Sequence, residues 1–280
     1  MVSRRGSGRM PLALMGAGAV ISVALAAALT VTALRDNASA DERGAAPGTS
    51  SESNPDPGPA TAAFGNPETD LFGRRVDVPV RATGVVLPQY PDQRQQPGTP
   101  GWTAAAPTPA NGEGVWQRLF GGPVVRFSAS DGPSRIDGSA ALGFAHTPQG
   151  AALAAEQIYW RTNANPKDRA LLTRLVDVTP QYLAEYDRLV SEGKVSDRLP
   201  DKLRPLLFAS DAFRIESYAD DFAKVQFARK ARETVDGQPT WVGMRLAVRW
   251  RDGDWKLTTV TGDERVQIES LLSIEGWTQW

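Results

Sequence analysis

The side chains that most often carry catalysis or bind metals are scarce in this sequence. It contains no Cys and one His, His146. Thiol nucleophiles, cysteine-ligated zinc, iron–sulfur clusters and disulfides are therefore excluded. His146 stands directly before Thr147-Pro148, which has the form of a helix start. We interpret His146 as a residue that packs or hydrogen-bonds locally, with a role in a site as the alternative.

The carboxylates do not form a recognisable catalytic or metal-binding pattern. Asp220-Asp221 and Asp252-x-Asp254 are short pairs typical of turns and do not match a calcium loop. Asp211 and Glu216 have no evident partner. The sequence also lacks a Gly-x-Ser-x-Gly elbow and a phosphate-binding Gly-x-x-x-x-Gly-Lys loop. We therefore predict a protein that is not an enzyme, with no catalytic, cofactor-binding or metal-ligating residues and no cofactor.

Basic and aromatic residues near the end of the sequence favour binding. The candidate interface consists of three arginines expected on the outer face of a sheet and three tryptophans near strand ends, namely Arg229, Arg245, Arg249, Trp241, Trp277 and Trp280. Tryptophan is enriched in interface cores. The alternatives are a solvated face balanced by neighbouring acids and tryptophans that close the end of the domain. The net charge is −1, so we predict no specific nucleic-acid binding, and a small-molecule ligand stays unknown.

The first 34 residues predict a membrane anchor. Three arginines, Arg4, Arg5 and Arg9, precede the uncharged stretch Pro11–Leu34. A stretch of this length can cross about 30 Å of hydrocarbon as a helix, and the basic flank favours the cytoplasmic side. We predict a single-pass protein of the cytoplasmic membrane, held in the bilayer by Pro11–Leu34, with its N-terminus inside and the rest outside.

A cleaved signal peptide is the alternative for this segment. Ala38-Ser39-Ala40 has the small-x-small form of a cleavage site, and cleavage after Ala40 would give a secreted protein. The apolar stretch is longer than the roughly 7–15 residues of most secretory signals. This length favours an uncleaved signal anchor.

Residues 35–114 are rich in proline and glycine and predict an extracytoplasmic linker. Twelve of the 21 prolines lie between Pro47 and Pro109. Such segments cannot keep a helix or a central strand, and few apolar side chains are present to offset the entropy of ordering. We therefore expect a disordered tether, with a short stretch of β character at Val76–Leu87, followed by an ordered domain over residues 115–280.

Three helices are predicted in the first half of this domain. Thr147-Pro148 begins one that is apolar nearly all round and therefore buried, Asn165-Pro166 begins the second, and Thr179-Pro180 begins the third. After Pro205 the apolar period changes to two, which predicts strands at 213–218, 223–235, 240–250, 255–261 and 266–272. Asp236-Gly237 and Asp252-Gly253 are hairpin signals. We predict an α+β domain of three helices packed on a curved antiparallel sheet of four or more strands.

The order of three helices and a meander resembles the cone-shaped nuclear-transport-factor-2-like (cystatin-like) fold, in which the hairpin Trp250-Arg-Asp-Gly-Asp-Trp255 would be a late sheet hairpin. A closer local resemblance lies in Val115-Trp-Gln-Arg-Leu-Phe-Gly-Gly-Pro123, Asp131-Gly-Pro133, Gly143-Phe-Ala-His-Thr-Pro-Gln-Gly150 and Trp277-Thr-Gln-Trp280. These motifs are similar to a family of uncharacterised, membrane-anchored actinobacterial proteins.

This resemblance implies a role in the cell envelope. The expected architecture is similar to that of the single-pass scaffold subunits of conjugation and type IV secretion channels, although fold alone does not set function. The implied function is a non-enzymatic scaffold of a conjugation-like or secretion-like complex, with itself and other envelope proteins as partners. The alternative is a cone domain that binds or hydrolyses a small molecule.

Overall fold

The computed structural model describes residues 63–200, 207–259 and 268–280, and the main element in these ranges is a twisted sheet. Its strand order is β13–β8–β9–β10–β11–β7, and β12 lies beside β10. The strands are β7 (Val176–Asp177), β8 (Ala212–Ala219), β9 (Phe222–Val235), β10 (Gln238–Arg251), β11 (Asp254–Thr258), β12 (Ile268–Leu271) and β13 (Thr278–Gln279). Because β7 runs parallel to β11 while the other neighbours are antiparallel, the sheet is mixed.

The two Asp-Gly turns of this sheet form where the sequence predicts them. Asp236 and Gly237 have φ values of 50° and 75°, and Asp252 and Gly253 have values of 54° and 79°. Positive φ at both central residues matches the right-handed twist of the paired strands. These turns connect β9 to β10 and β10 to β11. The two hairpin predictions are confirmed.

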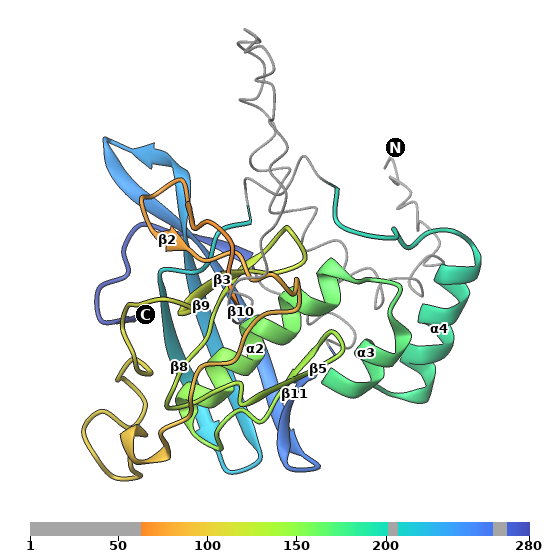
Figure 1. Cartoon of the computed structure of the whole chain (residues 1–280), viewed down its shortest axis with the longest axis horizontal. Coiled ribbons are helices and arrows are strands. Elements are labelled where there is room, and N and C mark those ends of the chain that lie inside the picture. Colours follow the sequence, from red (N-terminus) through yellow and green to blue (C-terminus); the bar gives the residue numbers. More distant parts are fainter. Residues whose placement is uncertain (1–62, 201–206, 260–267) are drawn as a thin grey trace, which may run out of the picture.

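Helix α2 (Pro148–Ala164) is the centre of the domain, and all its residues are buried. Thr147 caps it, since its side-chain oxygen accepts a hydrogen bond from the Gly150 amide at 2.9 Å. In Figure 1 the helix crosses one face of the sheet, which we call the inner face. The apolar residues of β9, β10 and β11 pack in the same core, for example Val225, Phe227 and Val248. The predicted buried helix is confirmed.

Two shorter helices follow at the side of the sheet that carries β11 and β7 (Figure 1). α4 (Pro180–Ser191) begins at the predicted cap, Thr179. α3 (Arg169–Leu175) begins later than predicted, because Asp168 and not Asn165 caps it by accepting from the Leu171 amide at 2.9 Å. Asn165 instead ends α2, since its amide donates to the Arg161 carbonyl.

The side of α2 away from the sheet is covered by small antiparallel pairs and irregular chain. The pairs are β1 (Glu68–Thr69) with β2 (Arg75–Val76), β3 (Trp116–Arg118) with β4 (Val124–Arg126), and β5 (Arg135–Asp137) with β6 (Ala140–Leu142). A 3-10 turn, η1, spans Pro91–Gln93. The domain therefore has three layers: the sheet, α2, and a wrapping layer built largely from residues 63–144.

The predicted fold class is wrong. The described residues are mostly sheet with three α-helices, and the main sheet is mixed, because the parallel strand β7 joins the antiparallel strands β8–β11. The disordered linker predicted for residues 35–114 is also wrong from residue 63 onward. Val76 and Asp77 are fully or almost fully buried, and Val76 packs in a second apolar cluster with Val115 and Trp116.

Donor side chains explain how the proline-rich segment becomes ordered. Prolines have no amide hydrogen, so a buried proline-rich segment leaves carbonyl oxygens that require donors from elsewhere. Gln149 of α2 donates to the carbonyls of Trp102 and Ala105 at 3.0 and 3.1 Å. Arg126 of β4 donates to the carbonyls of Pro107 and Pro109 at 2.8 and 2.5 Å.

Other side chains of α2 and β3 also donate hydrogen bonds to carbonyls of this segment and its surroundings. Arg161 is fully buried and donates to the carbonyls of Thr83 and Ser139 at 3.0 and 2.9 Å. Gln117 donates to the carbonyl of Val85 and accepts from the amide of the same residue. Side chains of the folded core thus replace the strand partners that residues 83–110 lack.

Removing one of these donors should loosen the wrapping layer. We expect Gln149→Leu to lower the free energy of unfolding by about 1–2 kcal/mol, because the half-buried carbonyls of Trp102 and Ala105 lose their donor. Amide exchange between Thr99 and Ala105 should accelerate more than exchange in the sheet. The matched control is Gln181→Leu, at an exposed position of α4. Unchanged exchange in 99–105 would show that Gln149 does not hold this segment.

No α-helix within residues 63–200, 207–259 and 268–280 has the length and apolar character needed to cross a membrane. The predicted anchor at Pro11–Leu34, the alternative cleavage after Ala40 and the first part of the predicted linker lie outside the described residues.

Candidate functional site

A buried ion pair lies between α2 and the inner face of the sheet. Glu156 of α2 is 2% exposed, and its carboxylate lies 3.3 Å from the guanidinium of Arg229 on β9. The Ser210 hydroxyl donates to the other carboxylate oxygen at 2.9 Å, and the Ser210 amide adds a third donor at 3.3 Å. Burial of a charged group is expensive unless it is paired in this way.

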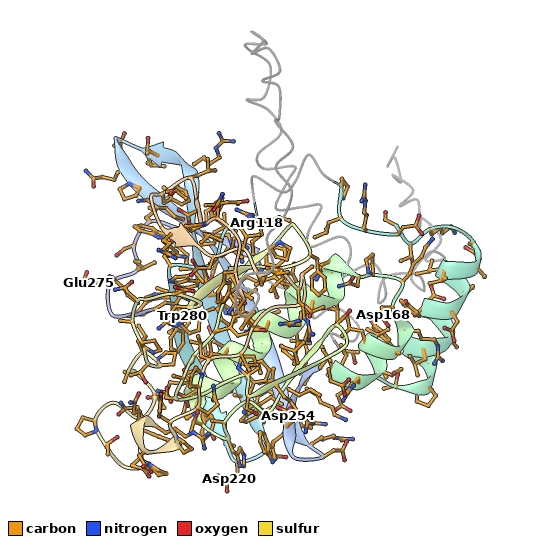
Figure 2. All side chains as sticks on the ribbon, in the orientation of Figure 1. Arg118, Asp168, Asp220, Asp254, Glu275 and Trp280 are labelled. Atoms are coloured by element: carbon orange, nitrogen blue, oxygen red, sulfur yellow. The ribbon has the colours of Figure 1, made fainter. Side chains whose placement is uncertain are left out.

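Tryptophan rings surround this pair. The guanidinium carbon of Arg229 lies 4.7 Å from the centre of the Trp160 ring. The indole nitrogen of Trp280 donates to the Ser210 hydroxyl at 2.8 Å, and the Trp280 ring packs against Phe213 with 4.2 Å between ring centres. In Figure 2, Trp280 lies among the side chains of the interior, whereas Glu275 lies at the periphery of the molecule. The last residue of the sequence is thus linked through Ser210 to the carboxylate of Glu156.

Two further arginines extend the group. Arg74 donates to the Ser210 carbonyl at 3.2 Å, pairs with Asp211 at 3.1 Å, and lies 4.2 Å from the centre of the Trp116 ring. Arg126 lies 5.2 Å from the centre of the Trp116 ring and 5.6 Å from that of Trp280. We call the whole set the arginine–tryptophan cluster: Arg74, Arg126, Arg229, Trp116, Trp160 and Trp280 with Glu156, Ser210 and Asp211.

Burial dominates the electrostatics of this cluster. It raises the pKa of Glu156, against the opposing effects of Arg229 and Ser210. It lowers the pKa of Arg126 to about 10, and the neighbouring charge of Arg74 lowers it further. A raised carboxyl pKa is a property of many general bases. Here, however, donors of the protein itself occupy both oxygens of Glu156, so the arrangement is suited to holding structure together.

A second buried carboxylate, Asp131, lies beside the start of α2. It accepts hydrogen bonds from the hydroxyls of Ser130 and Thr147, the latter at 2.6 Å. Burial raises the pKa of the Asp131 carboxyl above its ordinary value, and the two hydroxyl donors oppose this shift. Its oxygens are also used within the protein, and it joins the 128–131 loop to the cap of α2.

The raised pKa of Asp131 predicts a pH-dependent contribution to stability. Between its ordinary pKa and the higher value of the folded state, the folded chain binds more protons than the unfolded chain. The contribution is thus fully present below the ordinary pKa and is lost as the pH rises through the folded-state pKa. We expect the free energy of unfolding, relative to that of Asp131→Asn, to fall by up to about 1.4 kcal/mol per pH unit in this window.

Urea unfolding of the two proteins at several values between about pH 4 and pH 7 measures this difference. The Asn variant removes the titration of this one group while the other carboxylates stay as they are. A difference that grows as the pH rises would mean that the folded state lowers the pKa of Asp131.

The three predicted interface arginines do not share one face. Arg229 points from the inner face to Glu156, so its placement on the outer face is wrong. Arg245 and Arg249 do lie on the outer face. Arg245 pairs with Glu216 at 2.7 Å and with Glu269 at 3.0 Å, and Arg249 lies 3.4 Å from Asp177. The outer face therefore matches the alternative of basic residues balanced by neighbouring acids.

The three predicted interface tryptophans also differ in their surroundings. Trp280 belongs to the arginine–tryptophan cluster. Trp277 lies on Arg214 of β8, with 4.7 Å from the guanidinium carbon to the ring centre. Trp241 of β10 is partly exposed and pairs in register with Lys230 on one side and Leu271 on the other. Trp241 and Trp277, both half-buried, keep the character of surface candidates.

His146 connects the β8–β9 turn to the β10–β11 hairpin at one end of the sheet. Its ring stacks on Trp250 with 4.0 Å between centres and meets the edge of Trp255. Its Nε2 donates to the carbonyl of Asp220, and Tyr218 donates to the His146 carbonyl at 3.3 Å. Figure 2 shows Asp220 and Asp254 at this same end of the molecule. These contacts agree with the structural interpretation of His146.

Among the described ranges there is no group of three or more His, Cys, Asp or Glu residues placed to hold a metal ion. The cluster residues that sequence reasoning missed are Glu156, Ser210, Arg74, Arg126 and Trp116. The sequence does contain a signal for Glu156, because a glutamate on a helix that is apolar nearly all round must be buried and paired. No sequence signal identifies Ser210 or Arg74 as its neighbours.

Comparisons with known proteins agree with one continuous domain. Neither the curated proteins nor the solved structures gave a match. A family model matches residues 77–279, which include α2, all strands of the main sheet and the wrapping layer without β1 and β2. Because this match covers most of the sequence, the chain belongs to the family described as a domain of unknown function, DUF8175.

Proposed function

We propose that this protein is a membrane-anchored, extracytoplasmic assembly protein that acts by binding other proteins, including copies of itself, and not by catalysis. The observation that carries the proposal is the arginine–tryptophan cluster. Its buried carboxylate has the raised pKa of a candidate base, yet Arg229 and Ser210 occupy it and Trp280 closes over it. A general base must reach a substrate proton directly or through one water.

The predicted anchor at Pro11–Leu34 and its basic flank support the location outside the membrane. The analogy with conjugation and secretion channels depended on a cone fold, which the domain does not have. We therefore propose an envelope assembly as the setting, and experiment must identify the type of complex. The alternative of a ligand-binding or hydrolytic cone domain loses its basis for the same reason.

In-cell crosslinking of the tagged full-length protein, followed by mass spectrometry, tests this function. We expect crosslinks between copies of the chain and to other envelope proteins. The control is a variant that begins at Asp41 and carries a separate export signal, which separates contacts of the domain from contacts that the anchor alone creates. A full-length protein that is monomeric after extraction in mild detergent and captures no envelope protein would contradict the proposal.

A further inference from the structure

The last residues of the sequence are held by a short strand addition. In β13, Thr278 and Gln279 pair with Phe213 and Ala212 of β8, and the Trp280 amide donates to the Asp211 carbonyl at 3.2 Å. Trp280 then enters the arginine–tryptophan cluster beside Phe213. The receiving groove is made by β8, β9, β3 and the loop before β8, so every receiving residue comes from outside the tail itself (residues 272–280).

The connection that leads to this groove is short for the distance it crosses. β12 lies on one side of β10 and β13 on the far side of β8, so the chain from Leu271 to Thr278 passes four strand spacings. Four spacings amount to about 19 Å, while seven residues reach at most about 23–25 Å. A turn within the connection, in which the Trp277 amide donates to the Ile274 carbonyl, shortens that reach.

This connection also makes few contacts with the domain. Leu272 is 71% exposed, and Ser273, Glu275 and Gly276 are exposed as well. The hydrogen bonds of residues 272–277 join them to one another, as in the bond from the Glu275 amide to the Ser273 hydroxyl. A short and exposed hinge that ends in a segment held by strand pairing and ring contacts favours exchange of that segment between identical chains.

We propose that the groove beside β8 is a β-strand-addition site whose occupant in the assembled protein is the Trp277–Trp280 segment of a second copy. In an exchanged dimer each tail makes the contacts that it makes within its own chain: the pairing with β8, the bond from Trp280 to Ser210, and the ring contacts with Phe213 and Trp116. Exchange therefore keeps the contacts that hold the tail. This inference rests on the proposed function, for which it supplies the means of self-association.

The absence of cysteine from the sequence allows a direct test. Ala212 and Gln279 are Cα partners in the β8–β13 register, and paired antiparallel residues have the Cα separation that a disulfide requires. Two full-length single-cysteine variants, Ala212→Cys and Gln279→Cys, are co-expressed with different tags and oxidised. A 212–279 disulfide between them can form only if the tail of one chain occupies the groove of the other. Each variant alone is the matched control for symmetric or random disulfides.

We expect a mixed disulfide dimer that is much more abundant than either control dimer and that is lost when Trp280→Ala is added to the Gln279→Cys chain. Absence of the mixed dimer overturns the exchange. In that case the double variant, with both cysteines in one chain, should give an internal disulfide. The mass of the uncrosslinked protein in detergent separates the two proposals: a dimer without the mixed disulfide refutes only the exchange, whereas a strict monomer refutes self-association as well.

Discussion

Replacing Glu156 by Leu should lower the free energy of unfolding by about 3–5 kcal/mol, a large part of the stability of a typical domain. The carboxylate is the acceptor for the Arg229 guanidinium and for the hydroxyl and amide of Ser210, all of which are buried. Without the carboxylate, these donors are left without an acceptor, because they are buried away from water. Urea unfolding, followed by the fluorescence of the buried tryptophans, measures the loss.

The matched control removes both charges. In Glu156→Leu with Arg229→Met, the uncompensated buried guanidinium is gone, and we expect most of the lost stability to return. The two single variants and the double variant form a cycle that isolates the coupling between the two side chains. Additive losses in this cycle would show that Glu156 and Arg229 do not interact in solution as they do in the structure.

Replacing Trp280 by Ala should lower the free energy of unfolding by about 3 kcal/mol, at the lower end for a large aromatic residue because Trp280 is only partly buried. The substitution removes the ring contacts with Phe213 and Trp116 and leaves the Ser210 hydroxyl without its indole donor. It should also free residues 272–279, which amide exchange would report as a loss of protection at the β13–β8 pairing.

Gln279→Ala is the control for this prediction, because Gln279 belongs to the same short strand but its side chain is exposed. We expect a change of less than about 0.5 kcal/mol there. If Trp280→Ala were equally mild, the tail would not be anchored in the arginine–tryptophan cluster, and the exchange proposal would lose its receiving site.

Local patterns predicted the regular elements well. The start of α4, the cap of α2 and both Asp-Gly turns lie where residue type and spacing placed them, because these features depend on a few neighbouring residues. The apolar period of two likewise predicted strands at the positions of β8, β9, β10 and β11. The start of α3 was predicted too early, because Asp168 and not Asn165 caps this helix.

The inward position of Arg229 could have been predicted by the same reasoning. A two-residue turn at Asp236-Gly237 pairs Val235 with Gln238, and this register places Arg229 opposite the even-numbered residues of β10 that face the core. The bulge near Pro239 shifts the register by two and therefore keeps the same face. Counting along the hairpin would have predicted that Arg229 is an inward residue in need of a carboxylate.

The order of residues 63–114 could not be predicted in this way. Proline content correctly excluded helices and central strands there, but it did not show that Gln149, Arg126 and Arg161 would supply the missing hydrogen bonds. Each donor lies far along the chain from the carbonyl that it satisfies, and no local window contains both. The fold class failed for the same reason, since the wrapping layer occupies the side of α2 that an antiparallel cone would leave to other helices.

The burial of α2 on every side has a consequence for the way the chain folds. An isolated helix of this length is marginal in water, and α2 has neither a polar face to expose nor a single apolar stripe to bury against one partner. The surroundings of α2 are complete only after two parts of the chain have packed onto it. One part is residues 83–144, which precede or directly adjoin it, and the other is the strands more than fifty residues beyond it. Contacts of such sequence separation, for example the bond between Arg74 and Asp211, are typical of slow-folding topologies. A nascent chain released before β8 is made would hold a helix with no sheet to cover it, so the domain should acquire its protection against proteolysis late in synthesis.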